Sequence, residues 1–172
     1  MRLAQYQSAA AATAQPAAYQ YDYLVPMIVG EVGELFGQRA KSVWHGWTRE
    51  KLQAELVSEY GDIAWGTAIL LKMEGVEFFR AQLRQGPATT VWGNEPSPWQ
   101  PLANKAANLF HFYTQEETHQ YIRGEAQQMW LTLESSCKAV TGTDFNTVLE
   151  RNLLKLQGRV ARGTLVGSGD HR

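Results

Sequence analysis

The sequence has little cysteine and no long hydrophobic run, and both absences exclude classes of protein. Its single cysteine, Cys137, cannot form an internal disulfide or a cysteine-rich zinc site. No segment approaches the roughly 20 consecutive apolar residues of a membrane-spanning helix, so we expect no membrane partner. The alanine-rich stretch near the amino terminus is interrupted at positions 5–8 and lacks the apolar core of a secretion signal. We therefore expect a cytoplasmic protein.

An excess of charge of either sign is also missing. The chain has 16 Lys and Arg residues against 17 Asp and Glu residues, for a formal net charge of −1. Because no basic cluster marks a nucleic-acid binder, we expect no nucleic-acid partner, and a site for a charged ligand must be local. A length of 172 residues with 44% hydrophobic and 11% aromatic content favours one packed domain over residues 1–172.

Apolar residues recur at three- and four-residue steps, which predicts an all-α protein. The segment 85–101 holds four of the six prolines together with Trp92 and Trp99, so it is predicted to be a loop. A shorter helical piece is expected at 76–83. The main predicted helices span residues 3–14, 26–44, 48–74, 102–113, 114–140 and 145–157.

Four acidic residues form two pairs at helical spacing: Glu31 with Glu34, and Glu59 with Asp62. Residues at i and i+3 lie on one face of a helix, and the short connection at 46–47 predicts that the two helices are antiparallel neighbours. The two pairs can then face each other. Four carboxylates repel one another unless cations neutralise them, and carboxylate oxygens suit Mg²⁺ or Mn²⁺. The pattern predicts a site for two or more of these ions.

The alternative is that the acids form an ordinary solvated helix face, which is the more common arrangement. Against it, Glu59 projects within the apolar arc of its helix, where a carboxylate needs a partner or a metal. Glycines inside both helices further suggest close helix approach or ligand access. These are Gly30, Gly33, Gly61 and Gly66. From the residues alone, both alternatives stay open.

The spacing Glu-x-x-Glu, 24 residues, Glu-x-x-Asp resembles the signature of the MazG-like all-α nucleoside triphosphate pyrophosphohydrolases. The segments 5–7, 30–35 and 59–65 are similar to that family, and so is the final predicted helix with Asn152, Lys155 and Arg159. The resemblance covers about residues 1–83 and 143–172. Residues 84–142 are an insertion, a Pro/Trp loop and extra helix, relative to a minimal member.

The resemblance implies a MazG-like helical bundle that hydrolyses a nucleoside triphosphate between its α and β phosphates. It further implies that Mg²⁺ or Mn²⁺ is held by Glu31, Glu34, Glu59 and Asp62, with Glu31 or Glu34 activating the attacking water. The candidate phosphate-binding residues are Asn152, Lys155, Arg159 and, as a weaker candidate, Lys41.

The family also implies a homodimer or homotetramer. The tail at 167–172 is similar to endings among bacteriophage members, and the pattern resembles the MazZ branch. That branch implies a purine deoxynucleotide such as dGTP as substrate and the host cytoplasm as the location.

Two other functions are consistent with the sequence. Ferritin-like di-iron proteins need two Glu-x-x-His motifs, and this chain has a single one, Glu116 to His119. A non-catalytic helical interaction protein, with its acids merely on the surface, is the other alternative.

Overall fold

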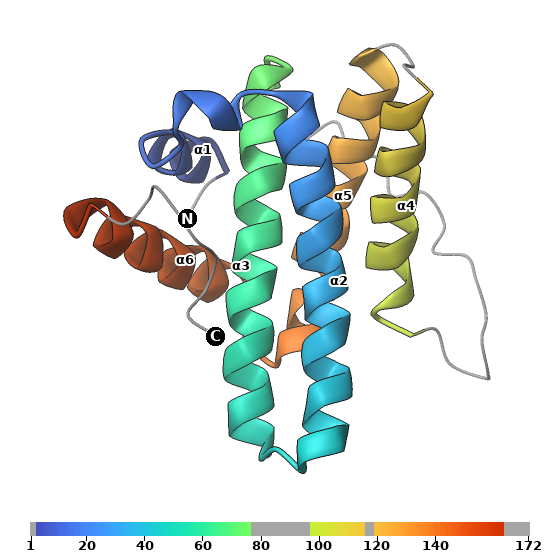
Figure 1. Ribbon diagram of the computed structural model, residues 1–172, viewed down its shortest axis with the longest axis vertical. Coiled ribbons are helices and arrows are strands. Elements are labelled where there is room, and N and C mark those ends of the chain that lie inside the picture. Colours follow the sequence, from blue (N-terminus) through green and yellow to red (C-terminus); the bar gives the residue numbers. More distant parts are fainter. Residues whose placement is uncertain (1–2, 77–96, 116–118, 164–172) are drawn as a thin grey trace.

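The prediction of an all-α protein is confirmed: every regular element among the described residues is a helix (Figure 1). The structure, a computed structural model, describes residues 3–76, 97–115 and 119–163. The elements are α1 (Leu3–Ala11), the short 3-10 helix η1 (Pro16–Ala18), α2 (Tyr21–His45), α3 (Arg49–Met73), α4 (Gln100–Thr114), α5 (His119–Thr141) and α6 (Phe145–Ala161).

The boundaries differ from the predicted ones mainly at helix ends. Helix α2 begins at Tyr21 rather than at 26, so Pro26 lies inside the helix, in its second turn, where its nitrogen cannot donate a backbone hydrogen bond. Helix α6 continues to Ala161, four residues beyond the expected end. The helical piece expected at 76–83 lies, after Val76, outside the described residues, as does most of the loop expected at 85–101. No described helix is both long and apolar enough to cross a membrane.

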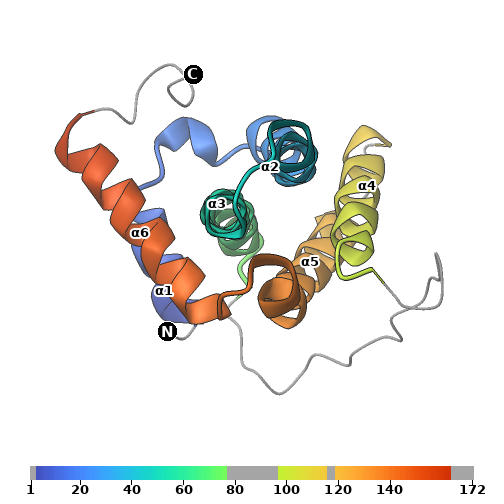
Figure 2. The ribbon, with the colours of Figure 1, turned by 90° about the horizontal axis from the view of Figure 1, so that it is seen from below.

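Helix α3 lies at the centre of the arrangement. Figure 2 shows it surrounded by α2, α5 and the pair α1 and α6, while α4 packs on the outer side against α2 and α5. Its buried side chains therefore point in several directions rather than along one stripe. The consequence is that polar side chains on α3 are carried into the interior, next to several different helices.

The α2–α3 hairpin is set by local signals in its turn. Gly46 adopts a left-handed conformation with φ 61° and donates its backbone N–H to Ser42, which ends α2. Thr48 then caps α3, since its side-chain oxygen accepts a hydrogen bond from the backbone N–H of Lys51 at 3.2 Å. Because the connection is this short, α2 and α3 run antiparallel and their middle turns lie level with each other.

The helix-interior glycines have two different roles. A Cβ atom at Gly61 would lie 2.8 Å from Cβ of Asn152 in α6, and one at Gly66 would lie 2.9 Å from Cγ1 of Ile28 in α2. These α3 glycines therefore permit close helix approach, as the sequence suggested. In contrast, a Cβ at Gly30 or Gly33 in α2 would meet nothing within 4 Å.

Alanine substitutions should separate a glycine that permits close packing from one that does not. At Gly37 in α2 a Cβ meets nothing within 4 Å, so Gly37→Ala should stabilise the protein by about 0.5–1 kcal/mol through helix propensity. Gly61→Ala should destabilise it by about 1 kcal/mol or more, because the overlap with Asn152 outweighs the propensity gain. Urea unfolding measures both, and shifts of the same sign would contradict the packing described here.

Candidate functional site

Three of the four predicted acids meet between α2 and α3. One carboxylate oxygen from each of Glu31, Glu34 and Glu59 lies within 4.8 Å of the other two. Glu34 is exposed, Glu31 is partly buried, and Glu59 is only 5% exposed. Oxygen donors from two helices thus converge at the edge of the core, which is the donor chemistry that a hard divalent cation prefers.

Gln38 is the one described neutral side chain that hydrogen-bonds to this cluster. It lies one turn beyond Glu34 on α2, is itself buried, and donates from Nε2 to Oε1 of Glu59 at 2.6 Å. This bond fixes the rotamer of the deepest carboxylate. The sequence analysis missed Gln38, although its i+4 spacing from Glu34 places it on the same helix face.

The environment disfavours the charged forms of two of these acids. Burial raises the pKa of Glu31 to about 8, and the negative charges of Asp62, Glu59 and Glu34 raise it further. The positive charge of Lys155 acts in the opposite direction and lowers it. Burial also raises the pKa of Glu59, although the hydrogen bond from Gln38 lowers it in part. The described part of the protein therefore does not compensate the full negative charge of the cluster, and a bound cation would.

Asp62, the fourth predicted acid, lies outside the group of three and pairs with α6. Its Oδ1 accepts a hydrogen bond from Nδ2 of Asn152 at 2.8 Å, and its Oδ2 accepts one from Nζ of Lys155 at 2.5 Å. Nζ of Lys155 also lies 3.2 Å from the hydroxyl oxygen of Ser58. Two of the predicted phosphate-binding residues are thereby brought directly to the acids.

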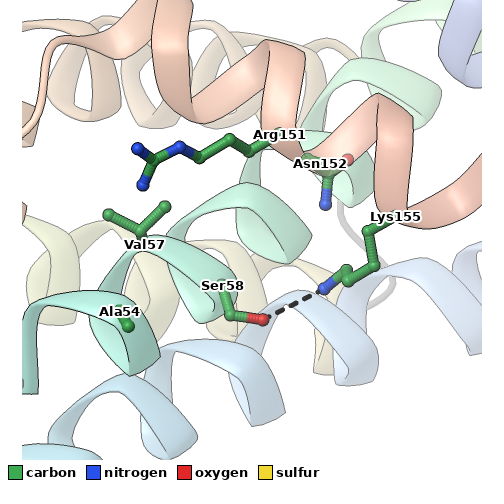
Figure 3. Close-up of a pocket in the computed structure, with 6 residues that line it drawn as sticks. All are labelled: Ala54, Val57, Ser58, Arg151, Asn152 and Lys155. Atoms are coloured by element: carbon green, nitrogen blue, oxygen red, sulfur yellow. Dashed lines mark hydrogen bonds between the residues drawn. The ribbon is translucent and has the colours of Figure 1, made fainter. Parts of the chain in front are cut away.

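A cavity of about 210 Å³ opens beside this ion pair, between α3 and α6 (Figure 3). Figure 3 shows the side chains of Arg151 and Lys155 reaching from α6 toward α3. The lining consists of Ala54, Val57, Ser58, Arg151, Asn152 and Lys155. Two cations at i and i+4 on its wall suit an anionic ligand. The sequence analysis missed Arg151, which stands four residues before Lys155 and could have been found by that spacing.

The remaining predicted residues lie farther from this cavity. Arg159 is partly exposed, one turn beyond Lys155 on α6. Lys41 is exposed on α2, and its side chain makes no hydrogen bond or ion pair with any residue that the structure describes. Neither position identifies a ligand by itself.

His119, the candidate iron ligand, lies away from the acid cluster. Its Nδ1 is 3.7 Å from Oε1 of Glu74 and 2.5 Å from the hydroxyl of Tyr21. Glu74 is fifteen residues beyond Glu59, which is roughly 22 Å along a helix. Glu116 lies outside the described residues. The described part of the chain therefore does not assemble a di-iron site around His119.

Comparisons of the chain with protein-family models, with curated proteins and with solved structures found no match. The chemistry is therefore inferred from the residues, their geometry and the resemblance of the motifs.

The raised pKa of Glu31 predicts a pH-dependent stability when divalent cations are absent. An unfolded Glu titrates near 4.3, so between about pH 4.5 and 8 the folded protein holds a proton that the unfolded chain has released. Stability should therefore fall as pH rises through this window. Glu31→Gln should flatten that fall and stabilise the protein at pH 8 by about 1–2 kcal/mol, a figure already reduced for partial exposure.

Thermal unfolding in EDTA between pH 5 and 8.5 measures this effect. Glu150→Gln, which removes an exposed carboxylate on α6, is the matched control and should leave the profile unchanged. Identical pH profiles for wild type and Glu31→Gln would show that Glu31 is not held in its protonated form.

Proposed function

We propose that this chain is a metal-dependent hydrolase that cleaves a nucleoside triphosphate between its α and β phosphates, releasing a monophosphate and pyrophosphate. The observation that carries the proposal is a carboxylate cluster on one side of α3 and a cavity lined by cations of α6 on another, with the ion pair of Asp62 and Lys155 between them. Glu31, Glu34 and Glu59 supply the carboxylates, and α6 supplies Lys155 and Arg151. The choice of bond comes from the resemblance of the motifs to MazG-like pyrophosphohydrolases.

The acids fit a divalent cation because the residues that the structure describes compensate their negative charge only in part. Glu59 is buried next to two other carboxylates, Gln38 is its one side-chain donor among the described residues, and Glu31 has a raised pKa. Mg²⁺ or Mn²⁺ bound there would neutralise phosphate charge and lower the pKa of a bound water. Asp62 is the candidate for a further ligand, since a carboxylate oxygen that accepts one hydrogen bond retains acceptor capacity.

In the proposed reaction, a side chain of α2 accepts the proton of the attacking water and side chains of α6 bind the leaving group. Glu31 is the favoured proton acceptor for the attacking water, because it is more buried than Glu34. As the oxygen of that water bonds to the α-phosphorus, the bond to the bridging oxygen breaks and pyrophosphate leaves with its negative charge. Lys155 and Arg151 are placed to bind that charge.

The size of the cavity favours the phosphates as its occupants. At about 210 Å³ it is smaller than the roughly 300–1,000 Å³ typical of pockets that enclose a whole drug-sized ligand. The phosphate chain would therefore lie between α3 and α6, and the nucleoside would extend beyond it. A preference for purine deoxynucleotides such as dGTP, and assembly as a homodimer or homotetramer, rest on the resemblance alone.

One observation favours a second role, as an interaction protein. Val43 and Trp44, at the end of α2, are 75% and 85% exposed, which is unusual for large apolar side chains in one short segment. A protein-binding role for this segment is compatible with catalysis at the acids, because Glu31 and Glu34 lie two or more turns earlier on α2 and Glu59 lies on α3.

A panel of ribo- and deoxynucleoside triphosphates with Mg²⁺ tests the proposed reaction. We expect monophosphate and pyrophosphate as products. The double variant Glu31→Gln, Glu59→Gln should lose at least about 100-fold in activity, because it removes two of the proposed ligands. Glu150→Gln is the control for the removal of a surface charge.

The products decide between the alternatives. Diphosphate and phosphate would show that the wrong bond has been assigned. A folded wild-type protein that hydrolyses no triphosphate, or a double variant as active as wild type, would favour the interaction protein. Bound iron with an oxo-bridge absorption band would favour the di-iron protein.

A further inference from the structure

Tyr6 is a buried polar residue that the proposed reaction does not itself require. It lies on α1, is 0% exposed, and its ring packs near that of Trp130, with ring centroids 5.9 Å apart. Its hydroxyl donates a hydrogen bond to Oδ1 of Asn152 at 2.9 Å, across 146 residues of sequence. Helix α1 therefore contacts the functional side chain of α6 through a specific polar bond as well as through apolar packing.

Tyr6 and Asp62 together hold the Asn152 amide in place, one at each end. With Oδ1 occupied by Tyr6, Nδ2 is directed at Asp62, to which it donates at 2.8 Å. The opposite orientation would place the amide oxygen against a carboxylate oxygen, and two acceptors repel. Asn152 is 3% exposed and lies against Gly61, where even a Cβ would approach it to 2.8 Å. The amide has little room to adopt another position.

The same chain of bonds continues to the cavity. Asp62 accepts from Asn152 with one oxygen and from Lys155 with the other, and Lys155 lines the cavity together with Asn152 (Figure 3). A buried hydroxyl on α1 is thus linked through an amide to the carboxylate that holds the cavity's ammonium group.

We infer that Tyr6 is a positioning residue of the proposed site, which orients Asp62 through Asn152 and thereby sets the place of Lys155. The inference rests on the proposed function, because it assigns Asp62 a part in binding the cation. The competing explanation is that Tyr6 only fills the interior between α1 and α6.

Tyr6→Phe tests the inference, because it keeps the ring and removes only the hydroxyl. Without that donor, the buried Oδ1 of Asn152 loses its partner, and the amide loses one of the two bonds that hold it in place against Asp62. We expect the affinity for Mn²⁺ alone to fall about ten-fold, the lower end of the effect of removing a hydrogen-bond partner of a metal ligand. Electron paramagnetic resonance of free Mn²⁺ in a titration of the full chain measures this affinity without any nucleotide.

Tyr60→Phe is a matched control. Tyr60 is also 0% exposed, and its hydroxyl bonds to the backbone oxygen of Leu133 at 2.9 Å and to Oγ of Ser136 at 2.7 Å. These partners belong to α5, on a different side of α3. Both variants should lower the melting temperature, but only Tyr6→Phe should weaken Mn²⁺ binding by more than two-fold.

A second variant tests whether Tyr6 acts on Asp62 through the amide of Asn152. It also replaces Tyr6→Phe as the test if that variant fails to fold. Asn152→Leu should itself weaken Mn²⁺ binding, and adding Tyr6→Phe to it should cause no further loss. Unchanged binding in Asn152→Leu, or additive losses in the double variant, would overturn the proposed route.

The possible failures are distinguishable. Equal Mn²⁺ affinity in wild type and Tyr6→Phe, or equal losses in Tyr6→Phe and Tyr60→Phe, would overturn the positioning role alone. A wild-type protein that neither binds Mn²⁺ nor hydrolyses a triphosphate would overturn the proposed function, and the positioning role with it.

Discussion

The enclosure of α3 is the constraint on which the rest of the structure depends. Because the middle of α3 is surrounded by other helices, a polar side chain that is buried there must find its partner inside the protein. Tyr60 reaches α5, Thr67 bonds back to the carbonyl of Ile63, and Asp62 takes its partners from α6. Among the residues that the structure describes, Glu59 accepts a side-chain hydrogen bond from Gln38 alone and lies next to the carboxylates of Glu31 and Glu34. This buried acid, rather than exposed Glu34, favours the proposed cation site over a solvated helix face.

The distribution of charge around α3 is strongly uneven even though the chain is nearly neutral. Acids gather toward α2, and cations approach from α6, with the ion pair of Asp62 and Lys155 between them. Such an arrangement costs stability in the absence of a ligand, since clustered carboxylates repel and resist desolvation. Groups with perturbed pKa values, such as Glu31 and Glu59, are frequent at functional sites. A metal-bound polyphosphate would satisfy both sides together, because its cation matches the acids and its oxygens match Lys155 and Arg151.

The sequence was sufficient to predict the features of the fold and of the candidate site that depend on spacing along the chain. Helical periodicity, with Gly46 and Thr48 in the turn, predicts the antiparallel hairpin that brings Glu31, Glu34 and Glu59 together.

The sequence was insufficient where a side chain's neighbour depends on the packing of distant helices. Three residues turn a helix by 300°, so Asp62 projects about 60° away from Glu59, and on an enclosed helix that difference directs it to α6 instead of α2. The bond between Tyr6 and Asn152 likewise depends on where α1 and α6 pack, which spacing along the chain does not encode.

The most direct test of the central claim is anomalous diffraction from a crystal of the full chain grown with Mn²⁺. The predicted result is an anomalous peak within coordination distance of Glu31, Glu34 and Glu59. The claim would be contradicted if these carboxylates showed no peak, with their side chains turned to solvent.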